Sequence, residues 1–265
     1  MNIWFSFFYQ PLINGLIAFY RVFGNLGWAI VALTGVVRLL LLPLLLPSLK
    51  AAEKMKELSP KLAKLKEKYG NDKQKFAQEQ IALYREAGIN PIAGLLPNIL
   101  QIAILIALFQ AFNKVLGNAV VTAKLNEVLY PFLKLAEGAN LNLKFFYLNL
   151  AKPDLIKLAG KNFPGIFLIL SALGQFLSAK LMMPIAKKQE KNADKTPEKA
   201  DDFAAMMQTQ SLYIFPAMTI LLGFSFPSGL VLYWTVFSLF NLVQQAIMKS
   251  KFSHKAGASF GQKLK

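Results

Sequence analysis

The sequence predicts an all-α, polytopic membrane protein with five transmembrane helices, a cytosolic helical hairpin and an N-terminal interfacial helix. Of the 265 residues, 55% are hydrophobic, and several apolar runs exceed the length of a soluble core helix. The net charge of +16 is a second indication, because much of it gathers beside the apolar runs, where it would set orientation and attract anionic headgroups. We expect residues 1–265 to form one domain.

The first segment, residues 1–24, is apolar but interrupted. Four polar residues recur every four positions on one side, and phenylalanines and leucines occupy the other; the polar ones are Asn2, Ser6, Gln10 and Asn14. This spacing predicts an amphipathic helix that lies in the membrane interface. A helix that crosses the membrane as a hairpin with the next span is the alternative.

The rest of the chain divides by hydropathy and charge. The predicted spans are 26–47, 91–116, 163–183, 206–226 and 228–248. Four other segments connect or follow them: a hairpin of two helices at 50–88, an external segment of mixed helical pattern at 117–162, a charged loop at 184–205 and a basic tail at 249–265.

The segment 50–88 sets the predicted orientation. It carries ten Lys or Arg and six acidic residues, the largest cluster of positive charge beside a span, and such clusters face the cytoplasm. By parity the N-terminus is then outside, and the loop 184–205 and the tail 249–265 are cytoplasmic. Within the hairpin, Asn71 or Asp72 should cap the second helix, and Pro60 either kinks the first arm or begins a new helix.

The first span contains one charge, Arg38. It lies ten residues after Trp28 and eight before Leu46, so about 15 Å and 12 Å of helix separate it from those ends. A guanidinium at that depth costs at least about 2.5–3.5 kcal/mol in lipid. Because the five predicted spans hold no Asp or Glu, no ion pair between spans can offset this cost.

Two environments for Arg38 remain open. In the structural one, backbone carbonyls and amide side chains satisfy the guanidinium inside a tight bundle. In the functional one, Arg38 lies in a wet groove with a fixed positive potential, and the groove admits an acidic segment from elsewhere.

Catalysis has little support in the sequence. The chain has no cysteine, and its one histidine, His254, lies in the basic tail. The predicted spans therefore offer no obvious general base, activated nucleophile or metal site, and the chain has no Gly-rich phosphate loop. We expect no enzyme activity, catalytic residue, metal or cofactor.

Three stretches of this sequence resemble the YidC/Oxa family of membrane protein insertases. They are GNLGWAIVALTGVVRLLLLPL at 24–44, the run from KMKELSPKLAKLKEKYG to IAILIALF at 54–109, and FPSGLVLYWTVFSLFNLVQQ at 226–245. The likeness covers nearly the whole chain and points to a bacterial short form without a large outer domain. It implies five spans, an outside N-terminus and a cytosolic helical hairpin between the first two spans.

The resemblance also implies a substrate-binding groove. Arg38 matches the family's groove arginine, which attracts acidic or polar stretches of a substrate. Gln175 corresponds to a polar groove residue of the third span, and Trp234 to an aromatic that contacts the passing segment, with Tyr233 beside it. Gln101 and Thr34 are groove residues by position.

The expected function is that of a membrane protein insertase and chaperone in the bacterial inner membrane. Nascent membrane proteins are the expected partners, with the Sec translocon, the ribosome, the signal recognition particle pathway and anionic lipids as further ones, and no DNA. One alternative is an anion or small-solute channel that uses Arg38 as a selectivity charge. Another is an assembly factor in which the hairpin only recruits partners.

Overall fold

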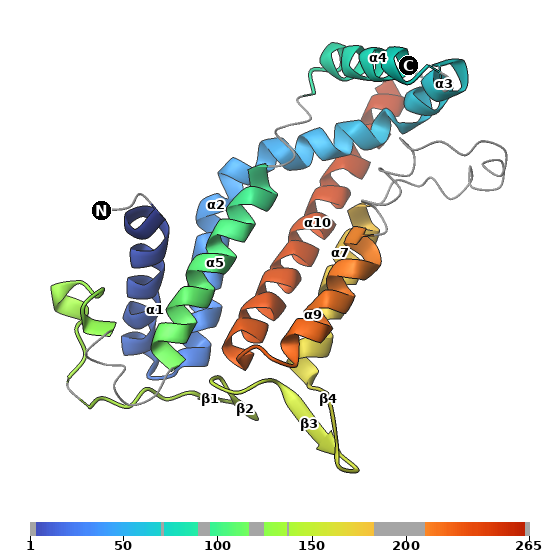
Figure 1. The fold of residues 1–265 in the computed structure, drawn as a ribbon. Helices are drawn as coiled ribbons and strands as arrows, with labels where there is room; N and C mark the ends of the chain where they lie inside the picture. The colour runs from blue at the N-terminus through green and yellow to red at the C-terminus, as the bar shows by residue number, and fades with distance from the viewer. Residues whose placement is uncertain are drawn as a thin grey trace. The chain divides into compact units, whose positions relative to one another are not determined.

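The computed structural model describes residues 4–69, 72–89, 96–116, 125–136, 138–182 and 210–262. The chain forms two compact units: the first comprises residues 1–38, 106–182 and 211–265, and the second comprises 39–105 and 183–210. Two long helices, α2 (Leu26–Glu57) and α5 (Leu96–Leu116), each contribute residues to both units (Figure 1). The described chain is mostly helical, as the sequence predicts.

In the first unit, a π-helical turn (Phe5–Tyr9) leads into α1 (Gln10–Phe23), and Gly24 ends α1 in the left-handed conformation with φ 63°. The polar row of this helix is packed against protein. Asn14 is 2% exposed; its Nδ2 donates to the carbonyl of Val128 (3.1 Å) and its Oδ1 accepts from the amide of Tyr130 (2.7 Å). Asn14 thus docks α1 on residues 125–136, and the position of residues 1–24 in the membrane interface stays a prediction.

The helices α7 (Ile166–Met182), α9 (Phe215–Gly223) and α10 (Ser228–Gln262) follow the loops, and α7 contacts both of the others (Figure 1). Small residues allow these close contacts. A Cβ on Gly174 would lie 2.8 Å from the Cβ of Ser238, and one on Gly223 would lie 2.3 Å from Leu168 Cδ1. Glycine and serine at such crossings are typical of helices packed within membranes.

The mixed helical pattern predicted for 117–162 is wrong for most of the described part, which contains four short strands. Strand β1 (Lys144–Phe145) pairs with β2 (Leu148–Asn149), and β3 (Leu155–Leu158) pairs with β4 (Lys161–Pro164), both antiparallel. Ala159 and Gly160 between β3 and β4 have φ of 48° and 76°. Two successive residues with positive φ form the tight turn that suits a two-residue hairpin. Ala159 and Gly160 are therefore the turn that joins β3 to β4.

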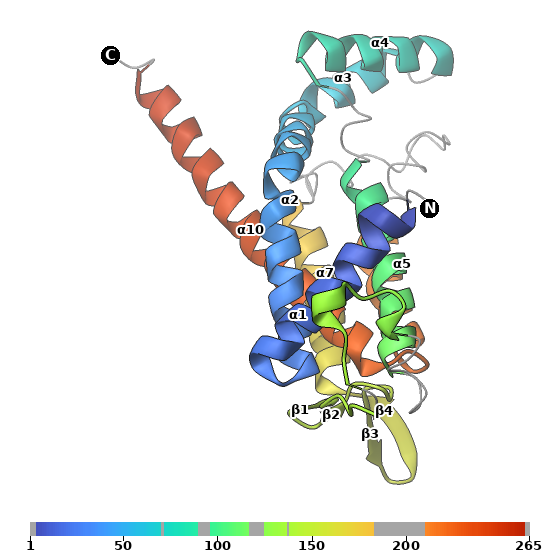
Figure 2. The ribbon, with the colours of Figure 1, turned by 90° about the vertical axis from the view of Figure 1, so that its left-hand side faces the viewer.

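These strands lie at the end of the first unit where α7 and α10 begin (Figures 1 and 2). The amides of Ser228 and Gly229, in the first turn of α10, donate to the carbonyls of Lys152 (2.7 Å) and Leu150 (3.1 Å). These bonds satisfy donors that the first turn of a helix leaves without partners.

Several predicted boundaries shift. The predicted span 163–183 begins as a helix only at Ile166, because Phe163 and Pro164 belong to β4. The predicted span 206–226 consists of a π-helical turn (Gln210–Ile214) and α9, which ends at Gly223, while 206–209 and the loop 184–205 lie outside the described residues. The predicted tail 249–265 continues α10 as far as Gln262.

In the second unit, α2 runs through Pro43 and Pro47 to Glu57, beyond the predicted end of the span at 47. Helices α3 (Ser59–Tyr69) and α4 (Lys73–Glu86) follow and contact each other. Pro60 lies at the start of α3, so it begins a new helix, which its fixed φ and missing amide proton favour. Asp72 caps α4, since its carboxylate accepts from the Lys75 amide at 3.0 Å.

Within the described residues, two helical stretches are long and apolar enough to cross a bilayer, Leu26–Leu44 in α2 and Ser228–Ile247 in α10. Three shorter apolar stretches, Ile102–Phe112, Ile166–Leu181 and Leu212–Gly223, coincide with the other predicted spans. The number of five spans stays a prediction.

Candidate functional site

Arg38 lies on α2 within the first unit and is 8% exposed. Its guanidinium contacts α10. Nη2 donates to Oδ1 of Asn241 at 3.0 Å, and Cζ lies 3.6 Å from the ring centroid of Phe237. A cation that close lies against the negative face of the ring, a contact worth about 0.5–2 kcal/mol. Tyr233 is also near enough to interact electrostatically with the guanidinium.

The Nε donor of Arg38 is not used by the described residues. Nε is buried and has no hydrogen-bond partner among the described residues. A buried donor without an acceptor costs about 1–3 kcal/mol, and more when it is charged. The described partners of Arg38 are thus one neutral amide and aromatic rings. The amide agrees with the structural alternative, in which neutral groups of the bundle satisfy the guanidinium, but the Nε without a described partner does not. None of these partners carries a charge that would neutralise the guanidinium.

The contact residues follow from the geometry of α10. Tyr233, Phe237 and Asn241 are spaced by four residues, which places them on one face of a helix. The rings of Tyr233 and Phe237 are 5.9 Å apart. Sequence reasoning identified Tyr233 but missed Phe237 and Asn241. The same spacing, read forward from Tyr233, could have found both of them.

The structure places Gln175 in a different set of contacts. Its Oε1 accepts from the hydroxyl of Thr219 on α9 (2.9 Å), and its Nε2 donates to Ser171 Oγ (3.4 Å) one turn earlier on α7. Ser171 and Thr219 are buried and Gln175 is half-buried. Gln175 thereby links α7 to α9 by hydrogen bonds that are favourable in an apolar setting.

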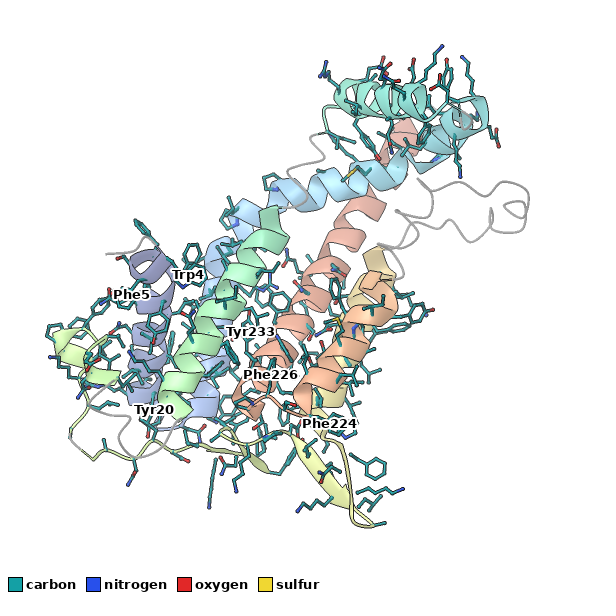
Figure 3. All side chains as sticks on the ribbon, in the orientation of Figure 1. Trp4, Phe5, Tyr20, Phe224, Phe226 and Tyr233 are labelled. Carbon is teal, nitrogen blue, oxygen red and sulfur yellow. The ribbon has the colours of Figure 1, made fainter. Side chains whose placement is uncertain are left out.

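The other predicted groove residues also have local contacts. Trp234 is 8% exposed, and the centroid of its ring lies 6.0 Å from that of Phe226, in the turn before α10. Figure 3 labels Phe226 and Tyr233, the neighbour of Trp234. Thr34 is buried one turn before Arg38 and donates to the carbonyl of Ile30 (2.7 Å). Gln101 belongs to α5, and its side chain lies outside the described residues.

A second buried charge, which sequence reasoning missed, lies at the beginning of α7. Asp154 is 1% exposed; its carboxylate accepts from the hydroxyl of Tyr147 (2.7 Å) and from the amide of Leu168 (2.8 Å). The Tyr147 hydroxyl in turn accepts from the amide of Ile166 (2.7 Å). A carboxylate is stabilised at a helix N-terminus by free amides and the helix dipole. Burial and the bond to Asp154 raise the pKa of Tyr147 to about 12.

Gly165 explains how the Asp154 carboxylate approaches the helix so closely. A Cβ at this position would lie 1.7 Å from Asp154 Oδ1, so only glycine fits. The described residues contain no group of three or more His, Cys, Asp or Glu side chains that could hold a metal ion. Through its bonds to Tyr147 and to the amide of Leu168, Asp154 fixes the start of α7 and joins it to the strand segment.

Comparison with known proteins gives consistent matches. The profile of the 60Kd inner membrane protein family matches residues 18–255. Membrane protein insertase YidC 1 of Streptococcus pyogenes serotype M3 is 34% identical over 86% of this chain and 68% of its own length. Membrane protein insertase YidC of Fusobacterium nucleatum is 32% identical, over 86% of this chain and 88% of the relative.

Longer relatives match as well. Membrane protein insertase YidC of Oleidesulfovibrio alaskensis is 33% identical over 94% of this chain, which spans only 39% of that relative. Among solved structures, a crystal structure of an active YidC insertase with its first transmembrane domain resolved superposes with a TM-score of 0.51 at 24% identity. That match covers 91% of this chain and 46% of the other, and it shows a shared fold.

Proposed function

This chain belongs to the 60Kd inner membrane protein family, and from that membership we propose that it is a membrane protein insertase and chaperone. It receives polar or acidic segments of nascent membrane proteins in a hydrophilic groove beside Arg38. It then releases their apolar helices into the bilayer. The observation that carries this proposal is a buried arginine on an apolar helix whose contacts are an amide and an aromatic ring, so its charge stays available to a substrate.

The proposed mechanism follows from the cost of moving charge into an apolar medium. A carboxylate without a partner is strongly disfavoured there, and a nearby guanidinium offsets part of that cost. The apolar helix of the substrate slides along the exposed leucine and isoleucine side chains of α7 into lipid; these include Ile169, Leu173 and Leu177. Burial of apolar surface drives this step, and the membrane potential adds to it for acidic segments.

The proposal includes a topology and partners. The N-terminus is outside and the C-terminus is in the cytoplasm of a bacterial inner membrane, with five spans. The α3–α4 hairpin then lies on the cytoplasmic side, where nascent chains emerge. The Sec translocon, the ribosome and the signal recognition particle are partners on that side, and anionic lipids bind the surplus of Lys and Arg.

The test is insertion by purified protein in liposomes of a small membrane protein with an acidic translocated tail. We expect Arg38→Ala to slow insertion about tenfold, equivalent to about 1.4 kcal/mol, and Arg38→Lys to restore most of the rate because it keeps the charge. A second substrate, in which the tail acids are replaced by Asn and Gln, should depend less on Arg38.

Two outcomes would count against the proposal. If Arg38→Ala inserted the acidic substrate at the normal rate, the groove would have no need of this charge. If the purified protein instead conducted anions, and Arg38→Ala abolished that conductance without affecting insertion, Arg38 would be the selectivity charge of a channel.

A further inference from the structure

The two donors that point to one side of the Arg38 guanidinium are used unequally. Nε and Nη2 form one edge of this planar group, an edge that can bind both oxygens of a carboxylate at once. Nη2 donates to Asn241 Oδ1 at 3.0 Å, whereas Nε is buried without an acceptor in the part of the chain that the structure describes. Of these two nitrogens, which together can bind both oxygens of a carboxylate, only Nη2 has an acceptor, and that acceptor is a single amide oxygen.

Phe237 restricts where a ligand can bind. Its ring centroid is 3.6 Å from Cζ, so the ring covers one face of the guanidinium. An approaching carboxylate is directed to the edges of the group, where the N–H bonds point. Asn241 is the residue on α10 that lies at such an edge, one turn after Phe237.

From this geometry we infer that Asn241 is a neutral placeholder on the Nη2 nitrogen of Arg38, and that a substrate carboxylate displaces it to bind Nη2 and Nε together. The inference rests on the proposed insertase function and adds a residue that sets specificity for acidic segments. The exchange replaces one hydrogen bond to a neutral amide oxygen with two hydrogen bonds to an ionised carboxylate, in which donor and acceptor are both charged. It also supplies an acceptor to Nε, which has none among the described side chains and carbonyls.

A neutral placeholder has a functional advantage over an acidic one. An acid at position 241 would form a permanent ion pair with Arg38, and a substrate carboxylate would then have to break that pair. Breaking a buried pair costs several kcal/mol. An amide holds the guanidinium in position between substrates with a hydrogen bond that is weaker than a buried ion pair.

The test is Asn241→Asp, which is nearly isosteric and keeps an acceptor at the same place. Beside a guanidinium the new carboxylate stays ionised, because an opposite charge favours the charged form. We measure insertion of the acidic-tail substrate and of its Asn/Gln-tail counterpart into the same proteoliposomes. The insertion rate of the acidic substrate divided by that of the Asn/Gln substrate should fall about tenfold, equivalent to about 1.4 kcal/mol. Asn241→Ala should lower this ratio less than Asn241→Asp does.

The order of the two variants separates a placeholder from a structural contact. If Asn241 only packed α10 against α2, the alanine variant would lose more than the nearly isosteric aspartate variant, and the inference would be overturned. An unchanged ratio in Asn241→Asp, or an equal loss for both substrates, would also overturn it. Gln110→Glu is the matched control, because Gln110 lies on α5, bonds Trp4 and is exposed; it should leave the ratio unchanged.

Arg38→Ala in the same assay keeps the two hypotheses apart. If Arg38→Ala reduces insertion of the acidic substrate and Asn241→Asp does not, the inference fails and the insertase proposal stands. If Arg38→Ala leaves the insertion rate of the acidic substrate unchanged, the proposed role of Arg38 in the groove is wrong, and the inference about Asn241 falls with it.

Discussion

At the scale of single residues, Arg38 and Asp154 are both buried among the described residues of the first unit, but they differ in how fully their polar atoms are hydrogen-bonded. Asp154 has donors from the backbone and from Tyr147, and these arrange the carboxylate as a helix cap. Arg38 has an amide, an aromatic face and one donor without an acceptor. Satisfied polar groups in an apolar setting stabilise one structure, whereas a group that is partly satisfied is open to a ligand. The first is typical of a structural role and the second of a binding site.

Tyr147→Phe should destabilise the first unit by about 1–2 kcal/mol, because it removes a donor to the buried carboxylate of Asp154. The pKa of Tyr147 is raised to about 12 from 10.0, so the folded state favours the protonated hydroxyl. Its contribution is fully present below pH 10 and is lost as the pH rises to 12. Thermal unfolding in detergent should therefore show a difference between wild type and variant that shrinks over this interval.

Tyr213→Phe serves as the control for this measurement, since Tyr213 is 59% exposed on the π-helical turn before α9. It should change the melting temperature little at any pH. An equal melting temperature for wild type and Tyr147→Phe at pH 8 would contradict the assigned role of the Tyr147–Asp154 bond.

At the scale of elements, α3 and α4 are the least buried helices among those described in full. Of their side chains, those that the structure describes are exposed or half-buried, and the two helices contact each other within the second unit. A polar helix pair with little apolar burial contributes little to the stability of a domain. Local residues nevertheless specify where both helices begin: Asp72 caps α4, and Pro60 lies at the start of α3. A helix pair with defined ends and little buried surface favours a role in function over a role in stability.

Replacing residues 54–87 with a short Gly-Ser linker should therefore impair insertion more than stability. We expect the melting temperature in detergent to change by only a few degrees, the scale of about 1 kcal/mol. The rate of insertion into liposomes should fall severalfold. Normal insertion with lost binding of ribosomes or translocon would instead identify the hairpin as a docking element.

At the scale of the whole molecule, the charge distribution predicts one orientation. The absence of cysteine makes this testable without removing native thiols. Single cysteines at Lys68 on α3 and at Lys157 on β3, both exposed, should react from opposite sides of the membrane. A maleimide that cannot cross the membrane should label Lys157→Cys in intact cells, and Lys68→Cys only after the cells are opened.

Asn2→Cys extends the experiment to the first helix. Labelling in intact cells would agree with an N-terminus outside and with residues 1–24 not crossing. Labelling only after cell opening would show that this segment crosses as a hairpin with the next span. Labelling of Lys68→Cys from outside would overturn the predicted orientation altogether.

The sequence by itself determined the features that depend on composition and local spacing. These are the helical membrane class, the family, the solitary arginine in an acid-free apolar span, and the helix pair after that span, whose second helix is capped by Asn71 or Asp72. Hydropathy and periodicity express such features within one stretch of chain, so no tertiary information is needed to find them.

Only the tertiary structure decided which residues meet. It paired Arg38 with Asn241, 203 positions away, directed Gln175 to Thr219, and packed the polar row of α1 on residues 125–136. It also showed strands where a helical pattern was expected, and it showed that the starts of α7 and α10 are capped by Asp154 and by the carbonyls of Lys152 and Leu150, which are distant in sequence. A polar side chain in an apolar segment must find a partner, but only packing determines which one.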